Sequence, residues 1–145
     1  MSNRSTSGIF DLGKGLNISS HLLKKEEVRD GDFLLGLMAS HKIDLIALAG
    51  YLKHVPDLLV KTYHKRIVNI HPSLLPAFGG QGMYGLKVHE AVVAQREKIS
   101  GLTIHYVNEV YDQGEIIFQA NQEVDPAWSA TALQAAVLRL EHAYY

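Results

Sequence analysis

A short apolar run that stops at a proline constrains this chain more than any other feature. Residues 67–70 read Ile-Val-Asn-Ile, which indicates a buried strand, and Pro72 ends it because proline has no N–H for the next ladder bond. Asn69 and His71 are two residues apart, so their side chains point to the same side of an extended chain. An amide and an imidazole therefore leave the strand end together, either to cap a turn or to form a site at the carboxyl edge of a sheet.

The rest of the chain alternates between the two kinds of regular structure. Apolar runs predict strands over residues 17–23, 43–49, 66–71, 102–107 and 115–123. Helical spacing predicts helices over residues 9–16, 32–41, 56–63, 86–98 and 129–144. Residues 43–49 are apolar almost throughout, which is typical of a parallel strand buried on both faces. The last two strands are joined by a loop too short for a crossover helix, so they pair antiparallel or diverge. We therefore predict an α/β, Rossmann-like fold with a mostly parallel sheet and flanking helices.

Composition excludes several classes of function. The chain has 145 residues, of which 47% are hydrophobic and 20% charged, as in a globular protein. Its net charge of −1 provides no basic field for nucleic acid or an anionic membrane. Cysteine is absent, which excludes disulfides and thiolate zinc sites. No apolar run reaches the roughly 18 residues of a membrane span. We expect a cytoplasmic protein that binds neither nucleic acid nor membrane.

A glycine-rich segment, Gly80-Gln-Gly-Met-Tyr-Gly85, matches the letters of the dinucleotide-binding fingerprint. That fingerprint requires a tight turn directly between a strand and a helix. Here Pro72 and Pro76 separate the glycines from the preceding strand. We therefore reject the dinucleotide fingerprint and interpret residues 79–85 as a flexible loop near the functional site.

Eight histidines raise the question of a metal. None belongs to a His-x-x-His or His-Glu-x-x-His pair, so only convergence of His71, His89 and His105 from distant positions could bind zinc. We predict no metal. His105 lies in a predicted strand and is either a core histidine or a support for a site. The others are most simply surface or helix residues: His21, His41, His54, His64, His89 and His142.

Three motifs taken in order resemble the folate-dependent formyltransferases. They are Asn69-Ile-His-Pro-Ser-Leu-Leu-Pro76, His105 and Asp112-Gln-Gly114, and the similarity runs from about residue 2 to residue 145. The resemblance implies transfer of the formyl group of 10-formyltetrahydrofolate, a co-substrate, to the amine of glycinamide ribonucleotide in purine biosynthesis. Alternatives are a formyltetrahydrofolate hydrolase, a methionyl-tRNA formyltransferase or a non-catalytic folate-binding remnant. Near-neutral charge disfavours the tRNA enzyme, as does Ala77-Phe-Gly-Gly80, where that enzyme has an arginine-rich segment.

The same resemblance assigns the catalytic groups. Asn69, His71 and Asp112 match the family's catalytic asparagine, histidine and aspartate. When an amine attacks the formyl carbon, an oxyanion develops, which an amide N–H and an imidazolium can stabilise. A carboxylate beside the imidazole favours its charged form and can receive the amine's proton, directly or through water.

The resemblance also implies the binding walls. The folate pocket would be formed by Asn69 and two segments: Leu52, Lys53, His54 and Val55, and then Asn108, Glu109, Val110, Tyr111 and Asp112. The ribonucleotide would be bound by Leu138, Arg139, Leu140 and Glu141. Glu141 would contact the ribose, although without the resemblance it would be interpreted as an exposed helix carboxylate. The family has a cis peptide, which would be Leu75–Pro76 here.

The resemblance further concerns the extent of the chain. We expect residues 1–145 to be a single formyltransferase domain without the family's first strands, N-terminal phosphate loop and C-terminal tail. Residues 1 to about 23 should then be weakly anchored, because an open sheet edge is prone to disorder or association. The assembly state is left open, with a homodimer among the alternatives.

Overall fold

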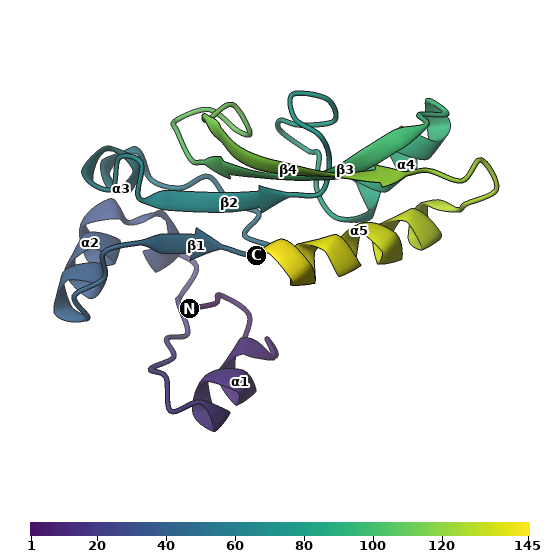
Figure 1. Ribbon diagram of the computed structural model, residues 1–145. Helices are drawn as coiled ribbons and strands as arrows, with labels where there is room; N and C mark the ends of the chain where they lie inside the picture. The colour runs from purple at the N-terminus through teal and green to yellow at the C-terminus, as the bar shows by residue number, and fades with distance from the viewer. The chain divides into compact units, whose positions relative to one another are not determined.

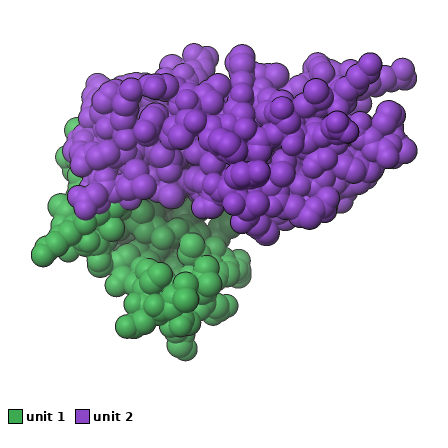
Figure 2. All heavy atoms as spheres, in the orientation of Figure 1, with its two compact units in different colours: residues 1–43, 55–59 green, residues 44–54, 60–145 purple.

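The computed structural model describes all 145 residues, which form two compact units. Unit 1 comprises residues 1–43 and 55–59, and unit 2 comprises residues 44–54 and 60–145 (Figure 2). Helix α3 (Asp57–Thr62) is divided between them. The helices and strands are labelled in Figure 1.

Unit 1 is helical. It contains α1 (Ile9–Gly15), the 3-10 turn η1 (Glu27–Arg29) and α2 (Gly31–Ser40). The Asp30 side chain accepts a hydrogen bond from Phe33 N at 2.9 Å and so caps α2. Leu34 and Met38, four residues apart, form the buried face of α2. These two helices are close to the predicted ranges.

The predicted strand at residues 17–23 is wrong. This segment makes a single isolated bridge, between Ser2 and Leu22. Ile18 is 61% exposed and Leu22 54% exposed, so its apolar side chains bury little surface that could stabilise a strand.

Unit 2 is built on a four-stranded sheet in the order β1-β2-β3-β4. The strands are β1 (Ile46–Leu48), β2 (Ile67–His71), β3 (Ile99–Tyr106) and β4 (Ile116–Glu123). β1 and β2 are parallel, whereas the pairs β2–β3 and β3–β4 are antiparallel. The α/β fold is confirmed, but the sheet is mixed where we predicted mostly parallel pairing. The antiparallel pairing of β3 with β4 is one of the two alternatives that their short connection left open. The antiparallel pairing of β2 with β3 was not predicted.

β1 departs from its prediction in two ways. It spans three residues rather than seven, and of these only Ile46 is buried while Ala47 is exposed. The expectation of burial on both faces is therefore wrong. The apolar sequence correctly predicted that Ile46 is buried, but it could not show that the opposite face, on which Ala47 lies, is exposed.

The core of unit 2 lies between the sheet and two helices, α4 (Leu86–Ala94) and α5 (Ala130–Tyr144). Figure 1 shows α5 running along the sheet, and Ser129 caps it by accepting from Ala132 N at 3.2 Å. The central cluster comprises Val92, Leu102, Ala120, Leu133 and Val137. Burying a side chain such as Leu133 contributes about 1.5–3 kcal/mol. This packing fixes α5 beside the ends of the strands. No helix in the structure has both the length and the apolar content to cross a membrane.

Candidate active site

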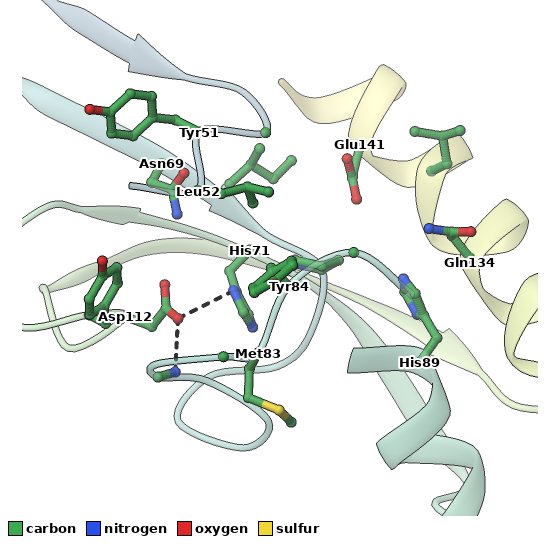
Figure 3. Close-up of a pocket in the computed structure, with 18 of the residues that line it drawn as sticks. Tyr51, Leu52, Asn69, His71, Met83, Tyr84, His89, Asp112, Gln134 and Glu141 are labelled. Carbon is green, nitrogen blue, oxygen red and sulfur yellow. Dashed lines mark hydrogen bonds and ion pairs between the residues drawn. The ribbon is translucent and has the colours of Figure 1, made fainter. Parts of the chain in front are cut away.

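A pocket of about 630 Å³ opens in unit 2 where β2 ends (Figure 3). Its walls come from the segment after β1, the end of β2, the 80–85 loop, the start of α4, the β3–β4 loop and one face of α5. The lining residues are Gly50, Tyr51, Leu52, Asn69, Ile70, His71, Pro72, Gly80, Gln81, Gly82, Met83, Tyr84, Gly85, His89, Tyr111, Asp112, Thr131, Gln134, Ala135, Leu138 and Glu141. Asn69, His71 and Asp112, far apart in sequence, are thus brought to one cavity.

His71 is held at both ring nitrogens. Its Nε2–H donates to the carbonyl oxygen of Phe78 at 2.8 Å, and its Nδ1 lies 3.6 Å from Oδ2 of Asp112. The same Oδ2 accepts from Gly80 N at 2.8 Å, as the dashed lines in Figure 3 mark. The side chain of His71 is 4% exposed. The loop after β2 therefore fixes the imidazole and the carboxylate together.

The β3–β4 loop presents Asp112 through an unusual backbone conformation. Asp112 has a φ of 56°, in the left-handed region that aspartate tolerates better than most residues. Two residues later, a Cβ at Gly114 would overlap the carbonyl oxygen of Tyr106. The glycine thus lets the loop fold back closely on β3, which turns Asp112 toward the end of β2.

Asn69 is oriented by His105. The carbonyl oxygen of Tyr106 lies 2.8 Å from His105 Nδ1 and can only accept, so Nδ1 carries the proton. Burial lowers the pKa of His105, although the Tyr106 hydrogen bond and the Asp112 charge oppose this shift. The ring is then neutral, and its bare Nε2 accepts from Asn69 Nδ2 at 3.2 Å. His105 Nε2 is also 3.7 Å from Asp112 Oδ1, which is no ion pair while the ring is neutral. Of the two interpretations left open, His105 is a support for the site.

A buried network ties the loop after β2 to the sheet. The Thr103 hydroxyl donates to the Ser73 carbonyl at 2.7 Å and accepts from Leu75 N at 2.9 Å. Gln119 Nε2 donates to Thr103 Oγ1 at 2.9 Å and to the Leu75 carbonyl at 3.0 Å. The Leu75–Pro76 peptide is cis, as the resemblance implied. β3 and β4 therefore position the segment that leads to Phe78.

The two predicted folate segments contribute only part of the pocket wall. Leu52, Tyr111 and Asp112 line the pocket, whereas Lys53, His54, Val55, Asn108, Glu109 and Val110 do not. His54 Nε2–H instead donates to the Glu109 carbonyl at 3.0 Å, and its ring packs edge-on to Tyr111. The segments therefore meet at His54, beside the wall rather than in it. Tyr51, which we did not predict, also lines the pocket, and burial raises its pKa, with a further contribution from Tyr111.

The predicted ribonucleotide segment also divides. Leu138 and Glu141 line the pocket, but Arg139 is exposed and Leu140 packs against the core cluster. Four consecutive helical residues cannot share one face, whereas residues three or four apart can. The same spacing, extended toward the start of α5, would have found Gln134 and Thr131, which line the pocket. Burial raises the pKa of Glu141.

His89 is the functional candidate that sequence reasoning missed. It lies in α4 as predicted, but it is 2% exposed and lines the pocket rather than the surface. Burial, and then the proximity of His71, lower its pKa. The sequence offered one indication of burial: His89 stands beside Val88 in an apolar helix. That position does not distinguish a histidine in the core from a histidine in a functional site.

The glycine-rich loop lies where we predicted it, beside the site. β2 ends at His71 and α4 begins at Leu86, so the loop is not a tight turn between strand and helix, and rejecting the dinucleotide fingerprint was correct. The structure contains no group of three or more His, Cys, Asp or Glu side chains arranged to hold a metal ion.

Comparisons with known proteins agree on one family. Residues 15–145 match the formyl transferase family. The chain is similar to the chloroplastic phosphoribosylglycinamide formyltransferase of Arabidopsis thaliana, with 46% identity over 124 residues covering 83% of this chain and 42% of that protein. It is also similar to the phosphoribosylglycinamide formyltransferase of Bacillus subtilis, with 41% identity over 105 residues, or 72% of this chain and 51% of that protein. The chain thus spans about half or less of the length of these curated relatives.

The structural comparison covers nearly the whole chain. The crystal structure of phosphoribosylglycinamide formyltransferase from Anaplasma phagocytophilum aligns with a TM-score of 0.87 at 32% identity. The alignment covers 99% of this chain and 66% of that one. The arrangement of elements around the pocket is therefore shared with a solved structure.

Proposed function

This chain belongs to the formyl transferase family, and from that premise we propose that its pocket transfers the formyl group of 10-formyltetrahydrofolate to the amine of glycinamide ribonucleotide, in purine biosynthesis. The observation that carries the proposal is the convergence of Asn69, His71 and Asp112 on one pocket. The names of the similar proteins support the choice of acceptor. We propose further that residues 1–145 act as one formyltransferase domain.

The end of the pocket around Asp112 suits the formyl donor. Tyr51, Leu52 and Tyr111 supply aromatic and aliphatic surface there, which fits the flat heteroaromatic ring of a folate. Asp112 supplies a carboxylate that can accept from the ring's N–H groups or from the reacting amine. The donor would therefore lie along this wall with its formyl group toward His71.

The chemistry requires one charge to be stabilised and one proton to be moved. The amine nitrogen attacks the formyl carbon, and the formyl oxygen becomes an oxyanion that the Asn69 amide N–H and His71 are placed to stabilise. The amine loses a proton to Asp112, directly or through water. The bond between the formyl carbon and the folate nitrogen then breaks, and that nitrogen takes up a proton. Formylated ribonucleotide and tetrahydrofolate result.

His71 must change one partner to take part. Its Nε2–H is engaged by the Phe78 carbonyl at 2.8 Å. Donation to the oxyanion therefore requires the substrate oxygen to replace that carbonyl, while Asp112 keeps its place beside Nδ1. The 78–80 segment would move slightly as the donor enters.

The hydrolase alternative uses the same three residues with water as the acceptor. The extent of the pocket favours transfer, because it continues past His71 to Gln134, Leu138 and Glu141 on α5. Water needs no such wall, whereas a ribonucleotide does. The tRNA alternative is disfavoured since no Lys or Arg lines the pocket.

Isotopic label in the formyl group distinguishes these functions. With both substrates present, we expect label in the ribonucleotide and tetrahydrofolate formed in equal amount. Without ribonucleotide, no tetrahydrofolate should form. Label released as formate would instead assign a hydrolase, and donor binding without any loss of label would assign a non-catalytic remnant.

A further inference from the structure

His89 is a buried polar residue that the proposed chemistry does not use. Its side chain is enclosed, and Nδ1 has no hydrogen-bond partner. Figure 3 shows His89 projecting from α4 toward the pocket, on the same side as Gln134, with His71 between it and Asp112. Buried polar atoms are nearly always hydrogen-bonded. His89 lines the pocket while Nδ1 is enclosed and unpaired, so its tautomer and the partner of its other ring nitrogen need an explanation.

The free atom determines which proton His89 carries. Burial and the nearby His71 lower its pKa, so the ring is neutral at neutral pH and has one donor and one acceptor nitrogen. A buried N–H without a partner is costlier than an unpaired lone pair, so the enclosed Nδ1 is the bare nitrogen. Nε2 then carries the proton. His89 lines the pocket, and Nε2 is not among its enclosed atoms without a partner, so Nε2 is the nitrogen left to act toward the pocket. His89 thus offers the pocket an uncharged N–H donor.

The surroundings define what this donor can bind. No Lys or Arg is among the lining residues, and Glu141 adds a carboxylate on the α5 wall. An anionic oxygen is therefore disfavoured at this end of the pocket. Thr131 and Gln134 add neutral hydrogen-bonding groups. The set suits an uncharged oxygen, either an amide carbonyl or a sugar hydroxyl.

We propose that His89 determines specificity for the acceptor substrate, because its Nε2–H donates to an uncharged oxygen of that substrate and so holds the attacking amine toward His71. The inference rests on the proposed function for the identity of the acceptor. It assigns a contact on α4, in addition to the α5 contacts expected from the sequence.

Three substitutions separate the hydrogen bond from the volume of the ring. His89→Gln places an amide nitrogen near the position of Nε2, His89→Asn reaches only the position of Nδ1, and His89→Leu removes both. Kinetics with glycinamide ribonucleotide and 10-formyltetrahydrofolate should show the ribonucleotide KM raised about five- to tenfold by Leu and Asn, the size of one lost hydrogen bond, and within about threefold for Gln. The donor KM should change by less than about twofold. His64→Gln, at an exposed site, is the matched control.

Acceptor analogues identify the oxygen. If the partner of His89 is the sugar hydroxyl, a deoxyribose analogue should bind the parent and the His89→Leu protein with equal affinity. If the partner is the amide carbonyl, an analogue that lacks this carbonyl should bind the two proteins equally. The inference is overturned if Asn serves as well as Gln, if both substrates weaken together, or if every variant keeps the parental KM. If His89→Leu does not fold, the ribonucleotide KM values of His89→Gln and His89→Asn are compared with each other, and this comparison alone tests the inference.

Calorimetry with ribonucleotide alone distinguishes this inference from the proposed function. Binding that depends on residue 89, in a protein that transfers no formyl group, would overturn the function and keep the contact. Normal transfer with binding independent of residue 89 would overturn the contact alone. If the parent protein binds no ribonucleotide, both are wrong.

Discussion

The two ends of the pocket differ in how completely the protein pairs its own polar groups. Around Asp112, three polar side chains have protein partners: Asp112 accepts from Gly80, His71 donates to Phe78, and Asn69 donates to His105. Toward α4 and α5, His89 Nδ1 has no partner, and burial raises the pKa of Glu141. A reaction centre benefits from groups fixed before the substrate arrives. The paired end has the character of such a centre. At the other end, the inferred partner of His89 Nε2–H is the ligand itself, while the enclosed Nδ1 stays unpaired.

The largest effect is expected at the paired end. His71→Ala should lower kcat by about a hundredfold or more, as the loss of an oxyanion donor or general acid usually does. Binding of the folate should change little, because the wall we propose for it consists of the pocket residues Leu52, Tyr51 and Tyr111. Steady-state kinetics and donor titration measure the two quantities, with exposed His64→Ala as control. Activity within a few-fold of the parent would exclude the assigned role.

The hydrogen-bond network of Thr103, which ties the loop after β2 to the sheet, should contribute measurably to the free energy of unfolding. Thr103→Val keeps the shape of the side chain but removes its bonds to Ser73, Leu75 and Gln119. The buried groups left unpaired should cost about 1–3 kcal/mol of unfolding free energy. Urea denaturation measures this, and exposed Thr6→Val is the control. Equal stabilities of the Thr103→Val and Thr6→Val proteins would show that the network does not hold the loop.

A titration can sharpen the electrostatic part of the comparison. The Asp112 charge raises the pKa of His105, against the larger opposite effect of burial. Asp112→Asn removes that charge at nearly constant shape, so the pKa of His105 should fall further. A histidine NMR titration reports the change, with His64 as internal reference. A higher or unchanged midpoint for His105 would mean that Asp112 does not act on it.

The smallest effect is on the pH dependence of stability. The pKa values of His89 and His105 are lowered in the folded protein, so below about pH 6.5 the unfolded chain binds protons that the folded chain does not. Their contribution to stability is therefore present above that pH and is lost as pH falls through the folded values. Urea unfolding at about pH 7.5 and about pH 5.5 should show a smaller loss for His89→Gln than for the parent. The raised pKa of Glu141 acts in the opposite direction, but it is common to both proteins and cancels in the difference. If the parent and His89→Gln lose the same unfolding free energy between the two pH values, the His89 side chain is in contact with solvent and its pKa is not lowered by burial.

Local patterns in the sequence predicted the parts of this site that depend on local geometry. Alternation along an extended strand placed Asn69 and His71 on one side, and helical spacing predicted α2 and α5 within about two residues at each end. The motifs quoted for the resemblance placed Asp112 with them. These features repeat at fixed spacing, so sequence alone can report them.

The misses concern contacts between distant segments. The burial of His89 depends on α5 packing against α4, which no pattern within α4 contains. The antiparallel pairing of β2 with β3 depends on the path of the intervening loop and helix. Naming Lys53 and Arg139 as pocket residues followed from transferring whole segments, although side chains on consecutive residues point in different directions.

Histidine side-chain NMR with the two ligands added separately tests the central claim most directly. Tetrahydrofolate should shift the signals of His71 and His105 and leave that of His89 unchanged. Glycinamide ribonucleotide should shift His71 and His89 and leave His105 nearly unchanged, while His64 responds to neither. If both ligands shift the same histidines, or the ribonucleotide shifts neither His71 nor His89, then the pocket does not hold a donor at one end and an acceptor at the other.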